Sequence, residues 1–154
     1  MKLVHAPDYS VRLSASWEPD AGPTSELLIS GRPTGVTVAG AVYEAALKWD
    51  EYILLFLTDD ILFEDGLNIH LLDKNFNVVD SAHLAFIYTT GIFSDLDLTQ
   101  ADSVRFCFFG GMVWTLKLFR KKRFALPIIS DPLGVSRPFK FSRMFQIRRH
   151  NLPS

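Results

Sequence analysis

Short runs rich in Val, Ile, Leu and aromatic residues recur along this chain about every ten residues, separated by Gly, Asp, Asn and Pro. This spacing is typical of an all-β sandwich or barrel, whereas an amphipathic helix needs apolar positions three and four residues apart. Such helical patterns are scarce here. We therefore expect an all-β fold, mainly an antiparallel β-sandwich of about eight or nine strands.

The predicted strands carry apolar residues either in alternation or in unbroken runs. They are Tyr9 to Trp17, Glu26 to Ser30, Val42 to Trp49, Tyr52 to Thr58, Leu67 to Leu72, Val78 to Tyr88, Ser103 to Phe109, Met112 to Phe119 and Phe139 to Arg148. Tyr52 to Leu57 is apolar at every position, which predicts a central strand covered on both faces. Residues 38–49 also suit one short helix because they are rich in alanine, although strand is the preferred prediction.

The connections between these strands have two kinds of sequence. Proline and glycine break up Glu18 to Gly40 and Leu126 to Pro138, where we expect long loops or edge structure. Asp50-Glu51, Asp73 to Asn77 and Gly110-Gly111 are short enough for tight hairpins. On both sides of the two glycines apolar and polar residues alternate, so each flanking strand is expected to bury one face.

The chain of 154 residues fits a single globular domain spanning residues 1–154, and 48% of its residues are hydrophobic. Its only cysteine, Cys107, lies in an apolar run and is expected to be a small buried hydrophobe. The first residues hold no apolar segment followed by a cleavage site, and no run approaches the length of a membrane span. We therefore expect a soluble, cytoplasmic protein that does not bind a membrane.

Acidic and basic residues are separated along the chain. Residues 1–100 hold fifteen Asp or Glu and five Lys or Arg, whereas residues 101–154 hold two and eleven. Clustered charge of one sign attracts partners of the other sign. The separation therefore predicts binding partners rather than a fold, unless the two blocks pair within the molecule or across a homodimer.

The acidic residues concentrate in connections between predicted strands. If the strands from Val42 onward alternate in direction, residues 59–66, 89–102 and 120–123 share one end of the sheet, and long loops on a rigid sheet are common binding sites. We expect the partner-facing residues to be carboxylates together with two apolar anchors. They are Asp59, Asp60, Glu64, Asp65, Asp95 and Asp97, with Phe63 and Phe93.

No catalytic, cofactor or metal motif is present in the sequence. A cluster of His70, Asp73, Asp80 and His83 is conceivable across a hairpin, but histidines paired on a strand surface are commoner. We therefore predict no catalytic residues, no cofactor and no small-molecule substrate. Asp59-Asp60 and Asp95-Leu96-Asp97 resemble the calcium-binding loops of C2-type domains, which would make the chain a calcium- and lipid-binding module; the spacing of an EF-hand is absent.

Basic and aromatic residues alternate in the last third of the chain, in Phe119 to Phe124 and Phe139 to Arg149. Nucleic-acid binders have this composition, but strand alternation also explains it, and the sequence pI of 6.4 opposes phosphate binding. Nucleic-acid binding is therefore the alternative rather than the expected function. Alternation places Arg143 on the apolar face of its strand, where it needs a carboxylate partner or a route to solvent.

The stretch Tyr52 to Leu84, with apolar strands around acidic loops, resembles the layout of bacterial toxin-immunity proteins, including those of contact-dependent inhibition. The resemblance covers about a fifth of the chain and includes no shared motif. It implies a non-enzymatic protein that binds and neutralises a cognate toxin, often a basic nuclease. Electrostatic complementarity would then speed association with that toxin.

Overall fold

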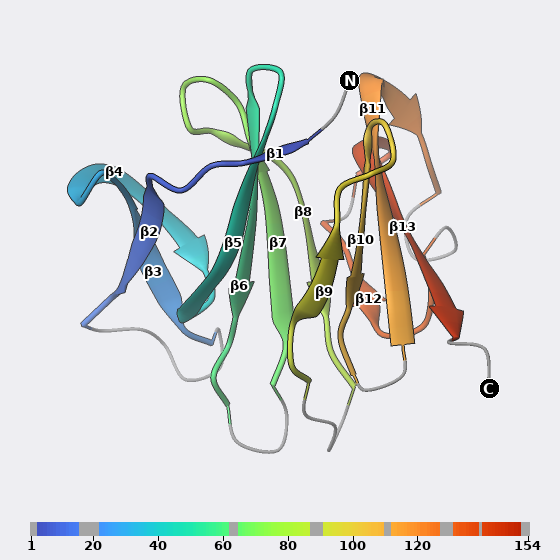
Figure 1. Cartoon of the computed structure of the whole chain (residues 1–154), viewed down its shortest axis with the longest axis horizontal. Helices are drawn as coiled ribbons and strands as arrows, with labels where there is room; N and C mark the ends of the chain where they lie inside the picture. Colours follow the sequence, from blue (N-terminus) through green and yellow to red (C-terminus); the bar gives the residue numbers. More distant parts are fainter. Residues whose placement is uncertain are drawn as a thin grey trace.

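The computed structural model describes residues 3–15, 22–61, 65–86, 91–109, 112–126, 131–138 and 140–151. Within these ranges the chain forms thirteen strands in three sheets and no helix, and so holds no helix able to cross a membrane. All pairings are antiparallel. The prediction of an all-β, mainly antiparallel fold is confirmed. Figure 1 shows the central sheet between the two others.

The three sheets differ in size. The central sheet has the order β1 (Val4–His5), β5 (Val42–Trp49), β6 (Tyr52–Thr58), β7 (Leu67–Leu72), β8 (Val78–Leu84) and β12 (Val135–Ser136). The four-stranded sheet has the order β13 (Ser142–Asn151), β11 (Met112–Phe124), β10 (Ser103–Cys107) and β9 (Ser94–Asp97). The three-stranded sheet has the order β2 (Tyr9–Leu13), β3 (Thr24–Ile29) and β4 (Arg32–Ala39).

The central sheet is buried on both faces, which makes the fold three-layered. On one face Phe56 packs with Phe106 and other side chains of the four-stranded sheet. On the other face Leu55 and Leu57 pack with Leu27 of β3. Strand β6 therefore has no solvent-facing side, as its unbroken apolar sequence predicts. Each large apolar side chain buried in this way contributes about 1.5–3 kcal/mol.

Strand alternation accounts for the four-stranded layer. Phe106 and Trp114 lie opposite each other and are fully buried, whereas Arg105 is exposed on the other face. Strands β10 and β11 form the predicted hairpin, with Cys107 opposite Val113; Gly110-Gly111 lie outside the described residues. Cys107 is half-buried, and burial raises the pKa of its thiol, with the Asp95 carboxylate adding to the rise.

The segment 38–49 contains no helix, since it holds the last two residues of β4 and all of β5. Within the segment predicted as loops or edge structure, the structure has an edge strand, β4. Gly40, at its end, has a φ of 124° and lies so close to β6 that a Cβ atom would be 2.5 Å from that of Leu57. Glycine is therefore required where this layer joins the central sheet.

The predicted grouping of loops is wrong because the short strand β9 lies inside the stretch expected to be a single connection. This extra strand places Asp102 near the β5–β6 turn, where the Trp49 Nε1 donates to Asp102 Oδ1 at 2.8 Å. Arg120 pairs with Asp102 at 3.6 Å and belongs to β11 rather than to a loop. Residues 120–123 therefore lie at the opposite end of the molecule from residues 59–61 and 65–66 (Figure 1).

Two buried ion pairs connect the edges of the central and four-stranded sheets. Arg137 pairs with Asp80 of β8 at 2.7 Å, and their side chains are 1% and 4% exposed. The Asp80 carboxylate also accepts from the Met144 N–H of β13 at 2.8 Å. Arg143, 5% exposed, is paired through both terminal nitrogens with Asp131. Strand parity predicted for Arg143 either a carboxylate partner or a route to solvent, and the structure has the first.

We expect Arg137→Met to destabilise the fold by about 3–5 kcal/mol in urea denaturation, because it leaves the Asp80 charge buried without its partner. Arg12→Met provides the control, since the Arg12–Glu26 pair at 2.7 Å is largely exposed and such pairs contribute about 0–1 kcal/mol. Equal losses in the two variants would contradict a special role for the buried pair.

Candidate functional site

Asp59, the first predicted partner-binding residue, is held inside the molecule. Its Oδ1 accepts from Asn68 Nδ2 at 2.5 Å, and its Oδ2 lies 2.8 Å from His83 Nε2. Asp65 Oδ1 accepts from the backbone N–H groups of Asp59 and Asp60 at 3.1 and 2.9 Å. These bonds join the described residues on either side of the β6–β7 connection, so Asp59 and Asp65 have intramolecular roles. Asp60 is exposed.

The neighbouring carboxyl groups have raised pKa values. Burial raises the pKa of Asp65, and the charges of Asp59 and Asp60 raise it further against the lowering effect of the two N–H donors. Burial also raises the pKa of Glu44 on β5, with a contribution from Asp65, although Thr58 donates to its Oε1 at 3.0 Å. Glu44, on β5, is therefore close enough to Asp65 for the two carboxylate charges to interact.

The structure does not assemble the conceivable cluster of His70, Asp73, Asp80 and His83. Asp80 pairs with Arg137, and Asp73 caps the β7–β8 turn by accepting from the Asn75 and Asn77 N–H groups at 2.9 and 3.0 Å. His83 contacts Asp59 instead. His70 is buried, with Nε2 2.9 Å from the Ala39 carbonyl oxygen.

The remaining predicted site residues are dispersed. Phe93 is half-buried, and its ring centroid lies 5.1 and 5.4 Å from those of Phe56 and Phe106, so it completes the core. Asp95 is exposed on β9, whereas Asp97 lies opposite Arg105 and accepts from the Thr99 N–H at 2.9 Å. Phe63 and Glu64 lie outside the described residues.

A first groove, of about 520 Å³, lies between the outer sides of β5 and β9. Strand β1 pairs with only the last part of β5, through Val4 opposite Lys48 and His5 opposite Leu47. The sides of the groove are formed by 43–46 and 93–96, and one end by 5–7. Phe93 and Asp95 from the predicted site therefore line it, together with Glu44.

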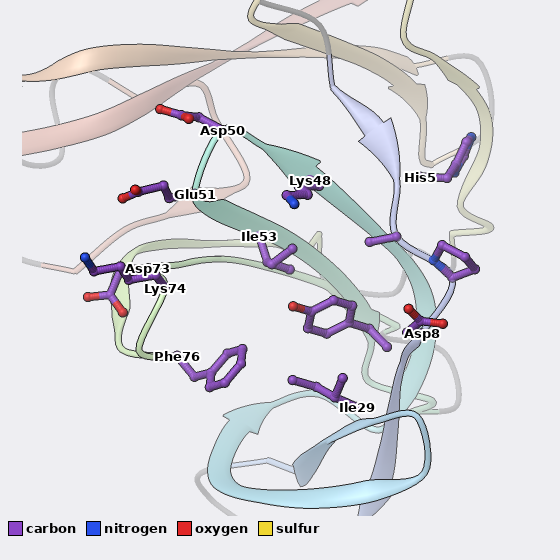
Figure 2. Close-up of a pocket in the computed structure, with 13 residues that line it drawn as sticks. His5, Asp8, Ile29, Lys48, Asp50, Glu51, Ile53, Asp73, Lys74 and Phe76 are labelled. Atoms are coloured by element: carbon purple, nitrogen blue, oxygen red, sulfur yellow. The ribbon is translucent and has the colours of Figure 1, made fainter.

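A second groove, of about 580 Å³, lies on the other side of the same β1–β2 connection. Figure 2 shows Ile29, Ile53 and Phe76 around its middle, with Asp50, Glu51 and Asp73 along one side. Asp8 lies on the opposite side in this view, and Lys48 and Lys74 also line the groove. Asp50, Glu51 and Asp73 come from the β5–β6 and β7–β8 turns, which the sequence correctly places at one end of the sheet, whereas Asp8 comes from the β1–β2 connection.

Each groove has an apolar floor and an acidic rim. Together they are lined by six carboxylates and two lysines: Asp8, Glu44, Asp50, Glu51, Asp73, Asp95, Lys48 and Lys74. Nothing in the sequence indicated that residues 5–9 would separate two grooves, because their position depends on the short β1 pairing. In the described ranges no three His, Cys, Asp or Glu residues are grouped to hold a metal ion.

Comparison with known proteins yields no relative: no protein-family model matches the chain, and no match is found among curated proteins or solved structures.

We expect His70→Gln to reduce the loss of stability on acidification. Burial lowers the pKa of His70 below its ordinary value of 6.5, so the unfolded chain takes up this proton at a higher pH than the folded one. Stability is therefore lost as the pH falls below 6.5, while glutamine retains a donor for Ala39 and does not titrate there. The fall in melting temperature from pH 7.5 to 5.5 should be smaller in His70→Gln than in the wild type and in exposed His150→Gln.

Proposed function

We propose that the chain is a non-enzymatic protein-binding module that binds a basic partner protein through its two acid-rimmed grooves. The observation that supports this function is the combination in one region of apolar floors and six rim carboxylates. An apolar floor contributes affinity by burying the partner's side chains, whereas the carboxylates select for a basic partner and exclude acidic ones.

Electrostatics favours rapid association at this surface. Rim carboxylates within about one Debye length, roughly 8 Å at physiological ionic strength, add their fields. Asp60 extends the acidic region beyond Glu44, since Asp65 accepts a hydrogen bond from the Asp60 N–H and its charge also raises the pKa of Glu44. We therefore assign Asp60 and Asp95 as flanking partner contacts, and Asp59 and Asp65 as residues that order the loop.

The partner class we propose is a cognate toxin with a basic surface, which would make the protein an immunity protein acting in the cytoplasm. The support is the acidic, apolar-floored surface together with the layout that Tyr52 to Leu84 shares with such proteins. A nuclease fits this surface because its substrate-binding face must be basic to attract phosphates. Covering that face would neutralise the nuclease without any chemical step.

The test begins with capture of the partner from the source cell at low salt, followed by association kinetics with the purified pair. We expect Asp8→Asn with Glu51→Gln to slow association about tenfold at low salt and much less at high salt, because steering depends on unscreened charge. The dissociation rate should change less, since neither residue belongs to the apolar floor.

Glu26→Gln with Asp97→Asn is the matched control, because it also removes two negative charges but at positions outside both grooves. The amide side chains keep an oxygen that can accept the hydrogen bonds which Glu26 and Asp97 accept from the Gly35 and Thr99 N–H groups in the wild type. If both double variants slow association equally, net charge rather than the grooves governs binding. If neither does, the proposed surface is wrong.

A further inference from the structure

The outer face of the four-stranded sheet has an array of basic and polar side chains. Alternation directs Arg105, Thr115 and Arg148 outward, while Phe106, Trp114, Leu116 and Ile147 are buried beneath. A shallow trough of about 300 Å³ crosses this face. Its lining residues are Ser103, Arg105, Thr115, Lys117, Gln146, Arg148 and His150.

Strand register places two arginines on either side of one threonine. Arg105 of β10 lies opposite Thr115 of β11, which in turn lies opposite Arg148 of β13. Neighbouring strands are about 4.8 Å apart, so the arginine stems are about 10 Å apart across Thr115. Lys117, two residues along β11, lies on the same face. The cationic groups can therefore converge over the threonine.

The hydroxyl at the centre of this row lacks a partner. Thr115 Oγ1 is buried and makes no hydrogen bond within the described part of the chain. Most buried polar side-chain atoms in folded proteins are hydrogen-bonded, so an exception needs an explanation. A hydroxyl between two guanidinium groups can donate to an anion that both arginines also hold.

Charge on this face favours an anion. Among the described residues that line the trough there is no carboxylate. Asp97, opposite Arg105 on β9, is the neighbouring acid, and the Arg105 charge helps to lower its pKa after the effects of its bonds with Thr99. Among the described residues, Lys117 and Arg148 have no ion pair. At least two cationic groups therefore remain available to a ligand.

We propose that this trough is a binding site for a phosphoryl group, held by Arg105 and Arg148 with Thr115 donating from the floor and Lys117 adding charge. A phosphoryl group presents several oxygens in different directions, which suits two guanidinium groups and a hydroxyl approaching from three sides. A planar carboxylate has only two oxygens and cannot satisfy all three groups equally well.

The phosphoryl group can belong to a free phosphorylated molecule or to a nucleic-acid backbone. Phe106 and Trp114 are buried, Phe124 is exposed at the far end of β11, and no Phe, Tyr or Trp is among the described residues that line the trough. Bases therefore have no stacking platform here, and a polynucleotide would bind through its phosphates without sequence preference. The site is independent of the acidic grooves, so either proposal can fail without the other.

The test measures the affinity of the full chain for inorganic tripolyphosphate by calorimetry and for a short labelled oligothymidine by fluorescence anisotropy, both at low salt. We expect Arg148→Ala to weaken binding about tenfold or more, and Thr115→Val several-fold without lowering the melting temperature, because valine suits a strand. Thr115→Ser should retain binding because it keeps the hydroxyl. Arg32→Ala, an exposed site on β4, is the control and should bind as the wild type does.

Comparison of the two probes identifies the source of the phosphate. Tighter binding of the oligonucleotide than of tripolyphosphate, with loss in the same variants, supports a nucleic-acid backbone; the reverse order supports a free phosphorylated ligand. The proposal is overturned if neither probe binds, if Arg148→Ala and Thr115→Val bind as tightly as the wild type, or if polyglutamate of equal charge binds as well as the phosphorylated probes.

Discussion

The buried ion pair of Asp80 with Arg137 lies where the central sheet meets β13 of the four-stranded sheet, and both of its members bond to β13. Arg137 also donates from Nε to the Ser81 carbonyl oxygen at 2.6 Å and from Nη1 to that of Phe145 at 3.2 Å. Its guanidinium lies 4.1 Å from the centre of the Phe145 ring. Burial lowers the pKa of Arg137, and the charge of Asp80 opposes this effect. One side chain thus connects β8 with β13 through charge, hydrogen bonds and packing.

The separation of charge in the sequence persists in the structure because the two blocks form mostly different sheets. The acidic part of the chain builds the three-stranded sheet and all of the central sheet except β12, whereas β10, β11 and β13 of the four-stranded sheet belong to the basic part. Asp80 and Arg137 form an ion pair between the two blocks, but the ion pairs of Asp102 with Arg120 and of Asp131 with Arg143 lie within the basic part. Pairing within the fold therefore neutralises little of the separation between the two blocks in the part of the chain that the structure describes.

Alternation and unbroken apolar runs were sufficient to predict the fold class, the double burial of β6 and the need for a partner at Arg143. They could not predict β9, because Ser94–Asp97 is rich in aspartate and has Asp95 at a φ of 56°; local propensity disfavours a strand there, and tertiary packing overrides it. Because β9 was not predicted, the connections that follow it were assigned to the wrong end of the sheet. The Asp59–His83 contact joins residues 24 positions apart, and only strand register brings them together.

The two charged surfaces differ in their response to acidification. Glu44 and Asp65 have raised pKa values, so they take up protons at a higher pH than ordinary carboxyl groups. Protonation removes negative charge from the acidic region around Glu44, whereas guanidinium groups keep their charge across the same range. Mild acidification therefore reduces the negative charge beside the first groove, and on the proposed function it would weaken the attraction of a basic partner. This pH dependence follows from the burial of Glu44 and Asp65.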